Sequence, residues 1–405
     1  MYLGLGLEER ASQLRKLIWN SVRHHADGKR VGLLLSGGFD STLLATLMAQ
    51  EGIDLRCYTV EAPELYPSEW NEALGTAIRL QIPIRKIMVT LPDMLKSTTI
   101  LRSCKRTPNV CLTTANILAA SRAALEDHCD IVMLGTGSDE LFGPSTKEVE
   151  TIWRFEHRAR LIGETAAWSL LLGDQSTDRT ELLYRGNMTP FTEKHIQTLF
   201  PDMDVVALLE DDIVEFYREL HAEAPDFRYE SLTLQLELEM RSSDVLMHEL
   251  ATAAYAHGMP IAFPFYDQAI AELAAGTPLG VKAYRGFEEN GSFDKKPDDW
   301  TGVINKYVLR YAFKDLIPDS VNKRPRLTNT LPFSWSMRDE DKKLIFECIE
   351  GSSIWERLGM NRKALATFTG ENLCKGEFWM MPRRFLLLYQ LSIWEDCPSI
   401  DFATH

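Results

Sequence analysis

The fold is decided by one stretch near the start of the chain, which reads VGLLLSGGFDS and spans Val31 to Ser41. Its first five residues are apolar and predict a buried strand, and the Ser-Gly-Gly turn that follows predicts a change of direction. We expect a helix to begin directly after the turn, with Asp40 or Ser41 as its cap. The turn suits an anion, because glycines let backbone N–H groups approach phosphate oxygens and the helix N-terminus adds positive charge. The hydroxyls of Ser36 and Ser41 add two further donors.

Short strands alternate with helices outward from this stretch, up to about residue 145. Strands are expected at 31–35, 55–60, 84–89 and 131–134, with helices from about residues 40 and 68 and over 114–126. This alternation predicts an α/β fold with a parallel sheet covered by helices on both faces. Ligands of such sheets bind at the carboxyl ends of the strands. An amphipathic helix with a structural role is expected before the first strand, from the spacing of Leu14, Leu17, Ile18 and Val22.

Strand signals nearly vanish beyond residue 145. Helix-compatible stretches replace them at about 148–172, 204–221, 230–257, 301–315 and 381–395. We therefore divide the chain into an α/β region over 1–145 and a mainly helical extension over 146–405 that completes the active site. No repeat or flexible linker separates the two, so we expect them to pack as one unit.

The composition argues against several classes of function. The 405 residues carry 58 acidic against 44 basic side chains, and a formal net charge of −14 repels a phosphate backbone, so nucleic acid is a poor substrate. Apolar runs fall far short of the roughly 20 residues that span a bilayer, and the N-terminus is too charged for a signal peptide. We therefore expect a cytoplasmic protein that binds neither nucleic acid nor a membrane.

A second glycine turn follows the strand expected at 131–134 and reads GTGSDELFG from Gly135 to Gly143. It puts Asp139 at the carboxyl end of a strand, in the same crevice as Asp40. Two carboxylates beside a triphosphate suit Mg²⁺, which prefers carboxylate and phosphate oxygens and neutralises charge on departing pyrophosphate. Asp139 could instead cap the helix that follows, and this alternative stays open.

The loop from Ser36 to Ser41 resembles the PP-loop of the ATP pyrophosphatases, and the chain has no G-x-x-x-x-G-K-[ST] loop of the kind that grips phosphates with a lysine. Together with the second glycine turn it resembles the synthetase domain of asparagine synthetases and their relatives, the β-lactam synthetases and lasso peptide cyclases. Three more segments carry this resemblance, AFPFYD at 262–267, NKYVLR at 305–310 and IPDSVNKRPR at 317–326. The resemblance covers about residues 10–335.

The resemblance implies that the protein uses ATP and Mg²⁺ to adenylate a carboxylate, which ammonia or an amine then attacks to form an amide. Asp40 and Asp139 would hold the metal. Lys306 and Arg326 would face the phosphates, where a cation stabilises charge that grows during transfer. Lys306 could instead be a solvated helix charge, and the basic cluster at 323–326 a surface patch. The implied nucleotide-binding set is Leu35, Ser36, Gly37, Gly38, Asp40, Ser41, Val60, Gly135 and Lys306.

Three departures from the family pattern shape the expected function. Asparagine synthetases carry an N-terminal glutaminase domain whose cysteine becomes the first residue, whereas here Tyr2 follows Met1. We therefore expect the nitrogen to come from ammonia, from an amine of the same or another substrate, or from a separate protein. Arg326 stands where the family has lysine, so an electrostatic role survives and proton transfer does not, because arginine stays protonated.

The third departure is Thr136, at a position that is glutamate in asparagine synthetases and tyrosine in β-lactam synthetases. A threonine hydroxyl is no general base near neutral pH. Spacing back from Asp267 puts His248 where β-lactam synthetases carry the glutamate that pairs with their tyrosine, with Glu249 beside it. Histidine is suited to proton transfer near neutral pH, but a lone histidine on a long helix is also typical of a packing or surface residue, and both interpretations stay open.

These observations favour an AMP-forming ligase that joins a carboxylate of a small molecule or peptide to ammonia or an amine. Plain asparagine synthesis ranks lower, because of Thr136 and the missing glutaminase domain. Two alternatives are a PP-loop enzyme that modifies tRNA, which the acidic charge and the missing CxxC pair oppose, and a non-catalytic nucleotide-binding relative. Retention of Ser36, Asp40, Asp139 and Lys306 favours an active enzyme.

Overall fold

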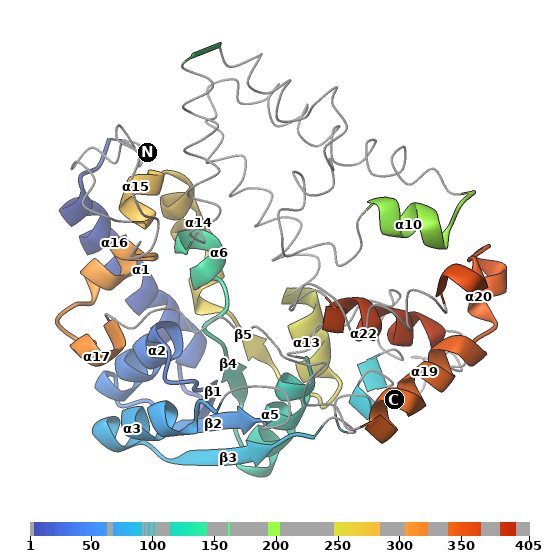
Figure 1. Ribbon diagram of the computed structural model, residues 1–405. Coiled ribbons are helices and arrows are strands. Elements are labelled where there is room, and N and C mark those ends of the chain that lie inside the picture. The colour runs from blue at the N-terminus through green and yellow to red at the C-terminus, as the bar shows by residue number, and fades with distance from the viewer. Residues whose placement is uncertain are drawn as a thin grey trace.

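The computed structural model of the protein describes most of the first 143 residues and six blocks of the remainder (Figure 1). The described residues are 4–62, 68–90, 93, 96–97, 100–101, 114–143, 161–162, 193–202, 247–283, 304–322, 339–365 and 381–393. The helices expected at 148–172 and 204–221 therefore lie almost wholly outside the described residues. No helix among the described residues is long and apolar enough to cross a membrane.

Five parallel strands form the sheet of the described chain, in the order β3-β2-β1-β4-β5. Their bounds are β1 Val31–Leu34, β2 Leu55–Glu61, β3 Ile84–Met88, β4 Ile131–Met133 and β5 Ile261–Ala262. The chain builds outward from β1 to β3 and then returns to place β4 on the other side of β1. The strand order thus reverses between β1 and β4, and ligands of open α/β sheets bind in the crevice at such a point.

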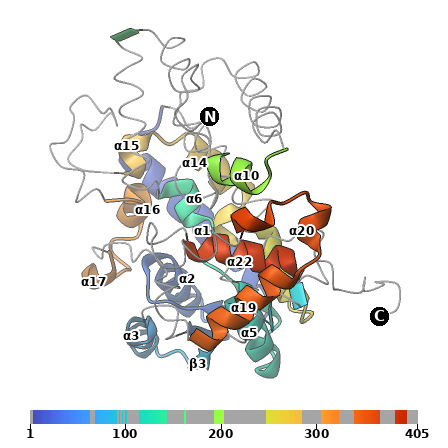
Figure 2. The same cartoon turned by 45° about the vertical axis from the view of Figure 1, so that its right-hand side comes forward.

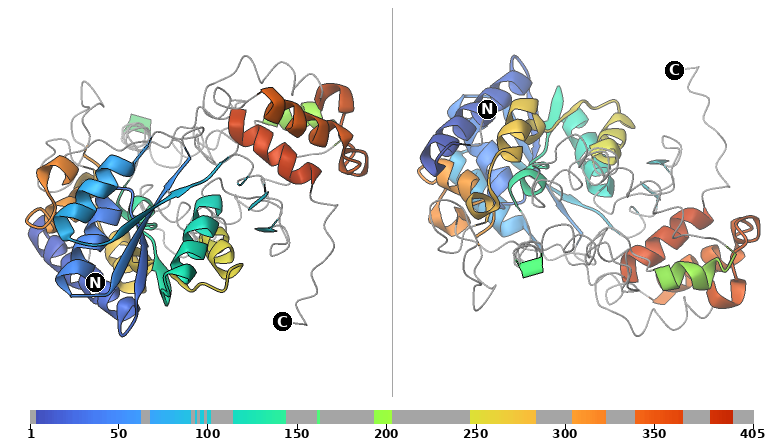
Figure 3. Two further views of the ribbon diagram at one scale, coloured as in Figure 1. Left: turned by 90° about the horizontal axis from the view of Figure 1, so that it is seen from below. Right: turned by 90° about the horizontal axis from the view of Figure 1, so that it is seen from above.

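Helices cover both faces of the sheet, as the sequence predicts (Figure 3). On one face lie α1 Leu7–Ala26, α2 Phe39–Gln50 and α3 Trp70–Leu80, and on the other α5 Thr114–Glu126 and α13 His248–Tyr255. Leu33 and Met133 point into the first core and Val132 and Leu134 into the second, because successive side chains of a strand alternate between faces. The predicted α/β fold is confirmed.

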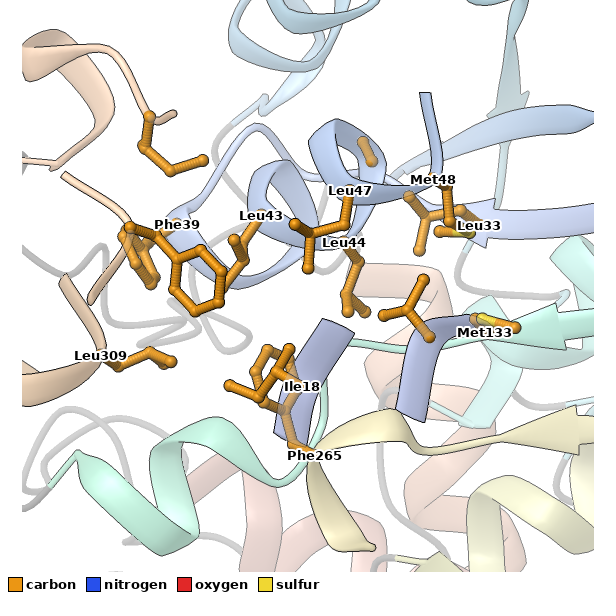
Figure 4. Packing of buried hydrophobic residues seen from close by; sticks show 14 of the residues in the cluster. Ile18, Leu33, Phe39, Leu43, Leu44, Leu47, Met48, Met133, Phe265 and Leu309 are labelled. Carbon is orange, nitrogen blue, oxygen red and sulfur yellow. The ribbon is translucent and has the colours of Figure 1, made fainter. Parts of the chain in front are cut away.

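The amphipathic helix expected before the first strand is α1. Leu14, Ile18 and Val22 are fully buried, and Leu17 packs against the same core. α1 contacts α2 and also elements from the far end of the chain: η2 Pro264–Tyr266, α14 Gln268–Ala275 and α16 Tyr307–Ala312. Figure 4 shows the shared core, in which Ile18 of α1 lies near Phe265 and Leu309. This helix therefore joins the two halves of the chain.

The described part of the second half is mainly helical, as predicted. The first half closes with α6 Ser138–Phe142. The remaining helices of the second half are α10 Glu193–Leu199, α15 Leu279–Lys282, α17 Asp319–Asn322, α19 Asp339–Gly351, α20 Ile354–Arg357 and α22 Met381–Ser392. A separate core joins α10, α19, α20 and α22 to Ala62 and Val89, at the carboxyl ends of β2 and β3 (Figure 2). The sequence did not indicate β5, whose two residues are too few for a strand pattern. The division of the chain at residue 145 stays a prediction.

Candidate active site

The turn between β1 and α2 is held by hydrogen bonds within itself. Ser41 Oγ accepts the backbone N–H of Ser36 at 3.1 Å and lies 3.0 Å from Ser36 Oγ, which accepts the N–H of Gly38 at 3.2 Å. The prediction that Asp40 or Ser41 caps the helix is wrong, because α2 begins at Phe39 and its N-cap is Gly38. The Ser41 hydroxyl bonds back into the loop, and no side chain caps the helix. The first amides of α2 are thus left for another acceptor, as an anion site requires.

Gly37 holds this turn in a conformation and a space that suit glycine alone. Its φ of +72° is left-handed, and a Cβ there would lie 2.5 Å from the backbone carbon of Glu72 and 2.6 Å from the backbone nitrogen of Ala73. α3 therefore packs directly against the turn. The shape of the turn is fixed by that helix as well as by its own hydrogen bonds.

The second glycine turn lies against the first. A Cβ at Gly135 would lie 3.0 Å from Asp40 Cβ and 3.3 Å from the backbone nitrogen of Ser41. The missing side chain lets the turn after β4 reach the first turn of α2. Val60, also in the predicted nucleotide-binding set, lies one residue before the end of β2, so the set gathers along the carboxyl ends of three neighbouring strands.

Asp139 does not cap the helix that follows it. The N-cap of α6 is Gly137, whose N–H is accepted by Glu140 Oε2 at 2.9 Å. Asp139 instead faces Lys306, with 2.9 Å between Asp139 Oδ1 and Lys306 Nζ. The alternative interpretation of this carboxylate is therefore wrong.

Lys306 lies between the two carboxylates and is only 4% exposed. Its Nζ is 2.5 Å from Asp40 Oδ2 and donates to Ser138 Oγ at 3.1 Å. Its backbone N–H donates to the carbonyl of Phe142 at 3.0 Å, and its φ of +55° is left-handed. Burial lowers the pKa of Lys306, but Asp40 and Asp139 outweigh burial, so the pKa lies above its ordinary value and the ammonium stays charged. The alternative of a solvated helix charge is wrong.

The carboxylates also suit a divalent cation. Asp40 Oδ1 is buried and has no hydrogen-bond partner among the described residues. Oxygen ligands from carboxylates and phosphates are those that Mg²⁺ prefers. The described residues contain no group of three His, Cys, Asp or Glu side chains that could hold a metal without help. Asp40 and Asp139 therefore fit a magnesium ion whose other ligands come from phosphate or water.

The sequence of the chain matches a known protein family. The family described as asparagine synthase matches residues 13–396, nearly the whole chain. The chain belongs to the asparagine synthase family. The resemblance identified from the sequence is confirmed, and family membership makes the protein an ATP-using synthetase. No curated protein matches the chain.

Two solved structures are similar to part of this asparagine synthase family member. NMN synthetase from Francisella tularensis is 16% identical, with a TM-score of 0.25, over 34% of this chain and 58% of that one. NH3-dependent NAD synthetase from Campylobacter jejuni subsp. jejuni NCTC 11168, in complex with the nitrate ion, is 20% identical, with a TM-score of 0.23, over 35% of this chain and 62% of that one. The chain spans less than two thirds of either protein.

The candidate bases lie at the start of α13. This helix leads into β5, so it runs from the carboxyl to the amino edge of the sheet and begins on the side where Asp40 lies. His248 is exposed, whereas Glu249 is 1% exposed. Thr136 lies half-buried in the turn between β4 and α6. Arg326 lies outside the described residues.

Sequence reasoning missed three neighbours of the site. Ser138 accepts a hydrogen bond from Lys306, and Arg310 stacks on Phe39, the residue before Asp40. The signal for Arg310 was its place one helical turn after Lys306 in the segment NKYVLR. Ser138 and Phe39 gave no such signal, since a serine beside a glycine turn and an apolar helix residue are common everywhere.

Proposed function

We propose that this member of the asparagine synthase family adenylates a carboxylate with ATP, releases pyrophosphate and transfers the acyl group to ammonia or an amine. The observation that carries the proposal is the Lys306 ammonium held between Asp40 and Asp139. It lies at the carboxyl ends of β1 and β4, where the strand order reverses and such sheets bind ligands, beside a loop that presents helix amides to an anion. The product is an amide, and AMP and pyrophosphate leave.

In this proposal the residues of the two glycine turns and Lys306 each interact with a different part of ATP or with its magnesium ion. The hydroxyls of Ser36 and Ser41 and the first backbone N–H groups of α2 would bind phosphate oxygens, and Leu35, Gly37 and Gly38 would shape the turn. Lys306 stabilises the negative charge that moves onto pyrophosphate as the α-phosphate is transferred. Asp40 and Asp139 would hold Mg²⁺, which when bound neutralises charge on the phosphates. Val60 and Gly135 would lie against the nucleoside part of ATP.

The second half-reaction needs a base that adenylation does not. A carboxylate is already ionised, whereas an ammonium loses one proton before it attacks and the tetrahedral intermediate loses another. We propose His248 or Glu249 for this step, since both begin α13 on the side of the sheet where the carboxylates lie. Thr136 has no group that titrates near neutral pH and would contribute shape or a hydrogen bond.

The rest of the second half would complete the site. We propose that residues 146–405 form the acceptor and carboxylate pocket on the α/β region of residues 1–145, with Arg326 as a second cation near the phosphates. The acid is a small molecule or a peptide, and a separate protein that supplies ammonia or substrate is compatible with this arrangement.

Pyrophosphate release tests the proposal. The protein is incubated with Mg²⁺, ATP and a panel of carboxylic acids, and ATP–pyrophosphate exchange is measured before product mass spectrometry. Asp40→Asn and Asp139→Asn should each abolish exchange and leave the fold intact. Asp54→Asn is the matched control, because Asp54 pairs with Arg30 next to the amino end of β2, on the opposite edge of the sheet. Normal exchange in either of the first two variants would contradict the assignment.

A further inference from the structure

Arg310 is a buried cation that the proposed reaction does not use. It lies on α16, is 8% exposed, and its backbone N–H donates to the carbonyl of Lys306 at 2.8 Å. The two cations thus occupy consecutive turns of the same helix start. Burial removes water from a guanidinium, and this costs free energy unless other partners replace the water.

The partners of Arg310 lie beside the catalytic groups rather than among them. Its guanidinium carbon is 4.8 Å from the ring centroid of Phe39, which directly precedes Asp40. Its Nε donates to the carbonyl of Asn305, which directly precedes Lys306, at 2.9 Å. A guanidinium nitrogen also donates to the carbonyl of Asn322, at the end of α17. One side chain therefore contacts the residue that precedes each member of the Asp40–Lys306 pair.

The electrostatic setting fits a group that supports this pair. Burial lowers the pKa of Arg310, whereas the charges of Asp40 and Asp139 act in the opposite direction. Two carboxylates and two cations, Lys306 and Arg310, then balance one another in this part of the site. The contacts need the flat shape of a guanidinium, since its face covers the Phe39 ring while its edge donates to carbonyls. A lysine would keep the charge, but its ammonium could not cover the ring and donate to both carbonyls at once.

We infer that Arg310 is a positioning residue of the adenylation site, which acts through Phe39 and Asn305 to fix the distance between Asp40 and Lys306. This inference rests on the proposed function. The left-handed backbone of Lys306 adds a reason, because such a conformation persists in a non-glycine residue only when its surroundings hold it. Arg310 holds the carbonyl just before it.

The matched control for Arg310 is Arg15. Its guanidinium carbon also lies near aromatic rings, 5.5 Å from Phe313 and 5.7 Å from Trp19. It also donates to the carbonyl of Ala312, the last residue of α16, at 3.0 Å. It therefore docks α16 against α1 through ring and carbonyl contacts of the same kind, with an added ion pair to Asp315, and among the described residues it does not touch Phe39 or Asn305.

Amide hydrogen exchange measured by mass spectrometry gives a test that needs no substrate. In the full-length protein, Arg310→Lys should speed exchange in residues 36–41 and 304–310 together by about tenfold, since a desolvated cation–π contact and buried hydrogen bonds hold both closed. Arg15→Lys should leave residues 36–41 at the wild-type rate. Unchanged exchange in both segments of Arg310→Lys, or equal acceleration by Arg15→Lys, would overturn the inference.

Kinetics separate positioning from general support of the fold. In ATP–pyrophosphate exchange, Arg310→Lys should lower kcat by about tenfold or more with little change in the KM for ATP, because misplaced Lys306 loses charge stabilisation in the transition state. Guanidinium ion at millimolar concentration should restore part of kcat in Arg310→Ala, and methylammonium should restore less. A loss confined to KM, or no preference for guanidinium, would count against positioning. If the wild type shows no exchange with any acid while the hydrogen-exchange result holds, the proposed function fails and the structural coupling stands.

Discussion

Lys306→Met tests how strongly the two carboxylates depend on the ammonium between them. Methionine keeps most of the length and apolar stem of lysine, so the change removes a charge and leaves little cavity. The Lys306 Nζ lies 2.5 Å from Asp40 Oδ2 and 2.9 Å from Asp139 Oδ1. After the change, both carboxylates face one another in a partly buried site with no cation between them.

The expected loss of stability is large for one substitution. Each attraction is about 6 kcal/mol at an effective dielectric constant of about 20 before desolvation is counted. Desolvation of the buried ammonium cancels much of this, and removing one partner of a buried ion pair lowers stability by about 3 to 5 kcal/mol. The Asp139 side chain is one third exposed, so water screens its attraction to Lys306. We therefore expect a loss of stability near the lower end of that range.

Urea unfolding with and without Mg²⁺ measures this effect. Lys306→Met should unfold at a lower urea concentration than the wild type without Mg²⁺. Mg²⁺ should return part of that stability to the variant and change the wild type less, because the ammonium already neutralises the same two carboxylates. Lys343→Met is the control, since Lys343 is 78% exposed on its side chain and its pair with Glu347 spans 3.8 Å. That change should be nearly neutral.

A loss below about 1 kcal/mol, the range of an exposed pair, would refute the argument that Lys306 neutralises buried carboxylates. Equal stabilisation of variant and wild type by Mg²⁺ would refute the claim that the metal and the ammonium neutralise the same two carboxylates.

Three further predictions follow from the same structure. Gly37→Ala should destabilise the fold by about 2 kcal/mol or more, because a left-handed backbone and a contact at 2.5 Å both oppose a Cβ. Gly38→Ala, where the nearest contact of a Cβ is 3.2 Å, should fold normally and weaken only ATP binding. Calorimetry of unfolding and of ATP binding distinguishes the two variants. His248→Ala should spare pyrophosphate exchange and slow amide formation by about 10² to 10⁴ if this residue is the base, and equal loss of both steps would indicate a packing role. Hydrogen bonds from Arg23 and Trp19 lower the pKa of Glu51, so its stabilising effect is present above the ordinary carboxyl pKa and is lost as pH falls through the lowered value. Glu51→Gln should therefore be less stable than the wild type at pH 7, by less than about 1 kcal/mol, and the two unfolding curves should converge at acid pH, once Glu51 is protonated in the folded protein.

The fold was largely predictable because its strong signals are local. The apolar run before Ser36 and the glycine turn specify a strand and a helix start, and the helix expected at 114–126 has those bounds in the structure. β5 was not predictable, because two residues, Ile261 and Ala262, carry no alternation. The cap of α2 was mispredicted because the Ser41 hydroxyl can bond either to the helix amides or back to Ser36, and the sequence does not show which. In the structure it bonds to Ser36.

The candidate site was predictable only in part, since its members meet through tertiary packing. Asp40 and Asp139 follow from their places at strand ends, and Lys306 came from the family resemblance. The stacking of Arg310 on Phe39 depends on how α16 docks against α1 and α2, which no local pattern encodes. Arg326 and its effect on the phosphates stay a prediction.

The separation of 266 residues between Asp40 and Lys306 has a consequence for synthesis on the ribosome. Both carboxylates are translated well before the lysine, and at cellular rates the delay is on the order of tens of seconds. During that time α1 also lacks α16, the partner that covers part of its apolar face. The nascent chain thus holds a half-covered sheet and two carboxylates without their lysine. Before Lys306 is synthesised, chaperones could cover the exposed apolar face of α1, and cellular Mg²⁺ could neutralise the two carboxylates.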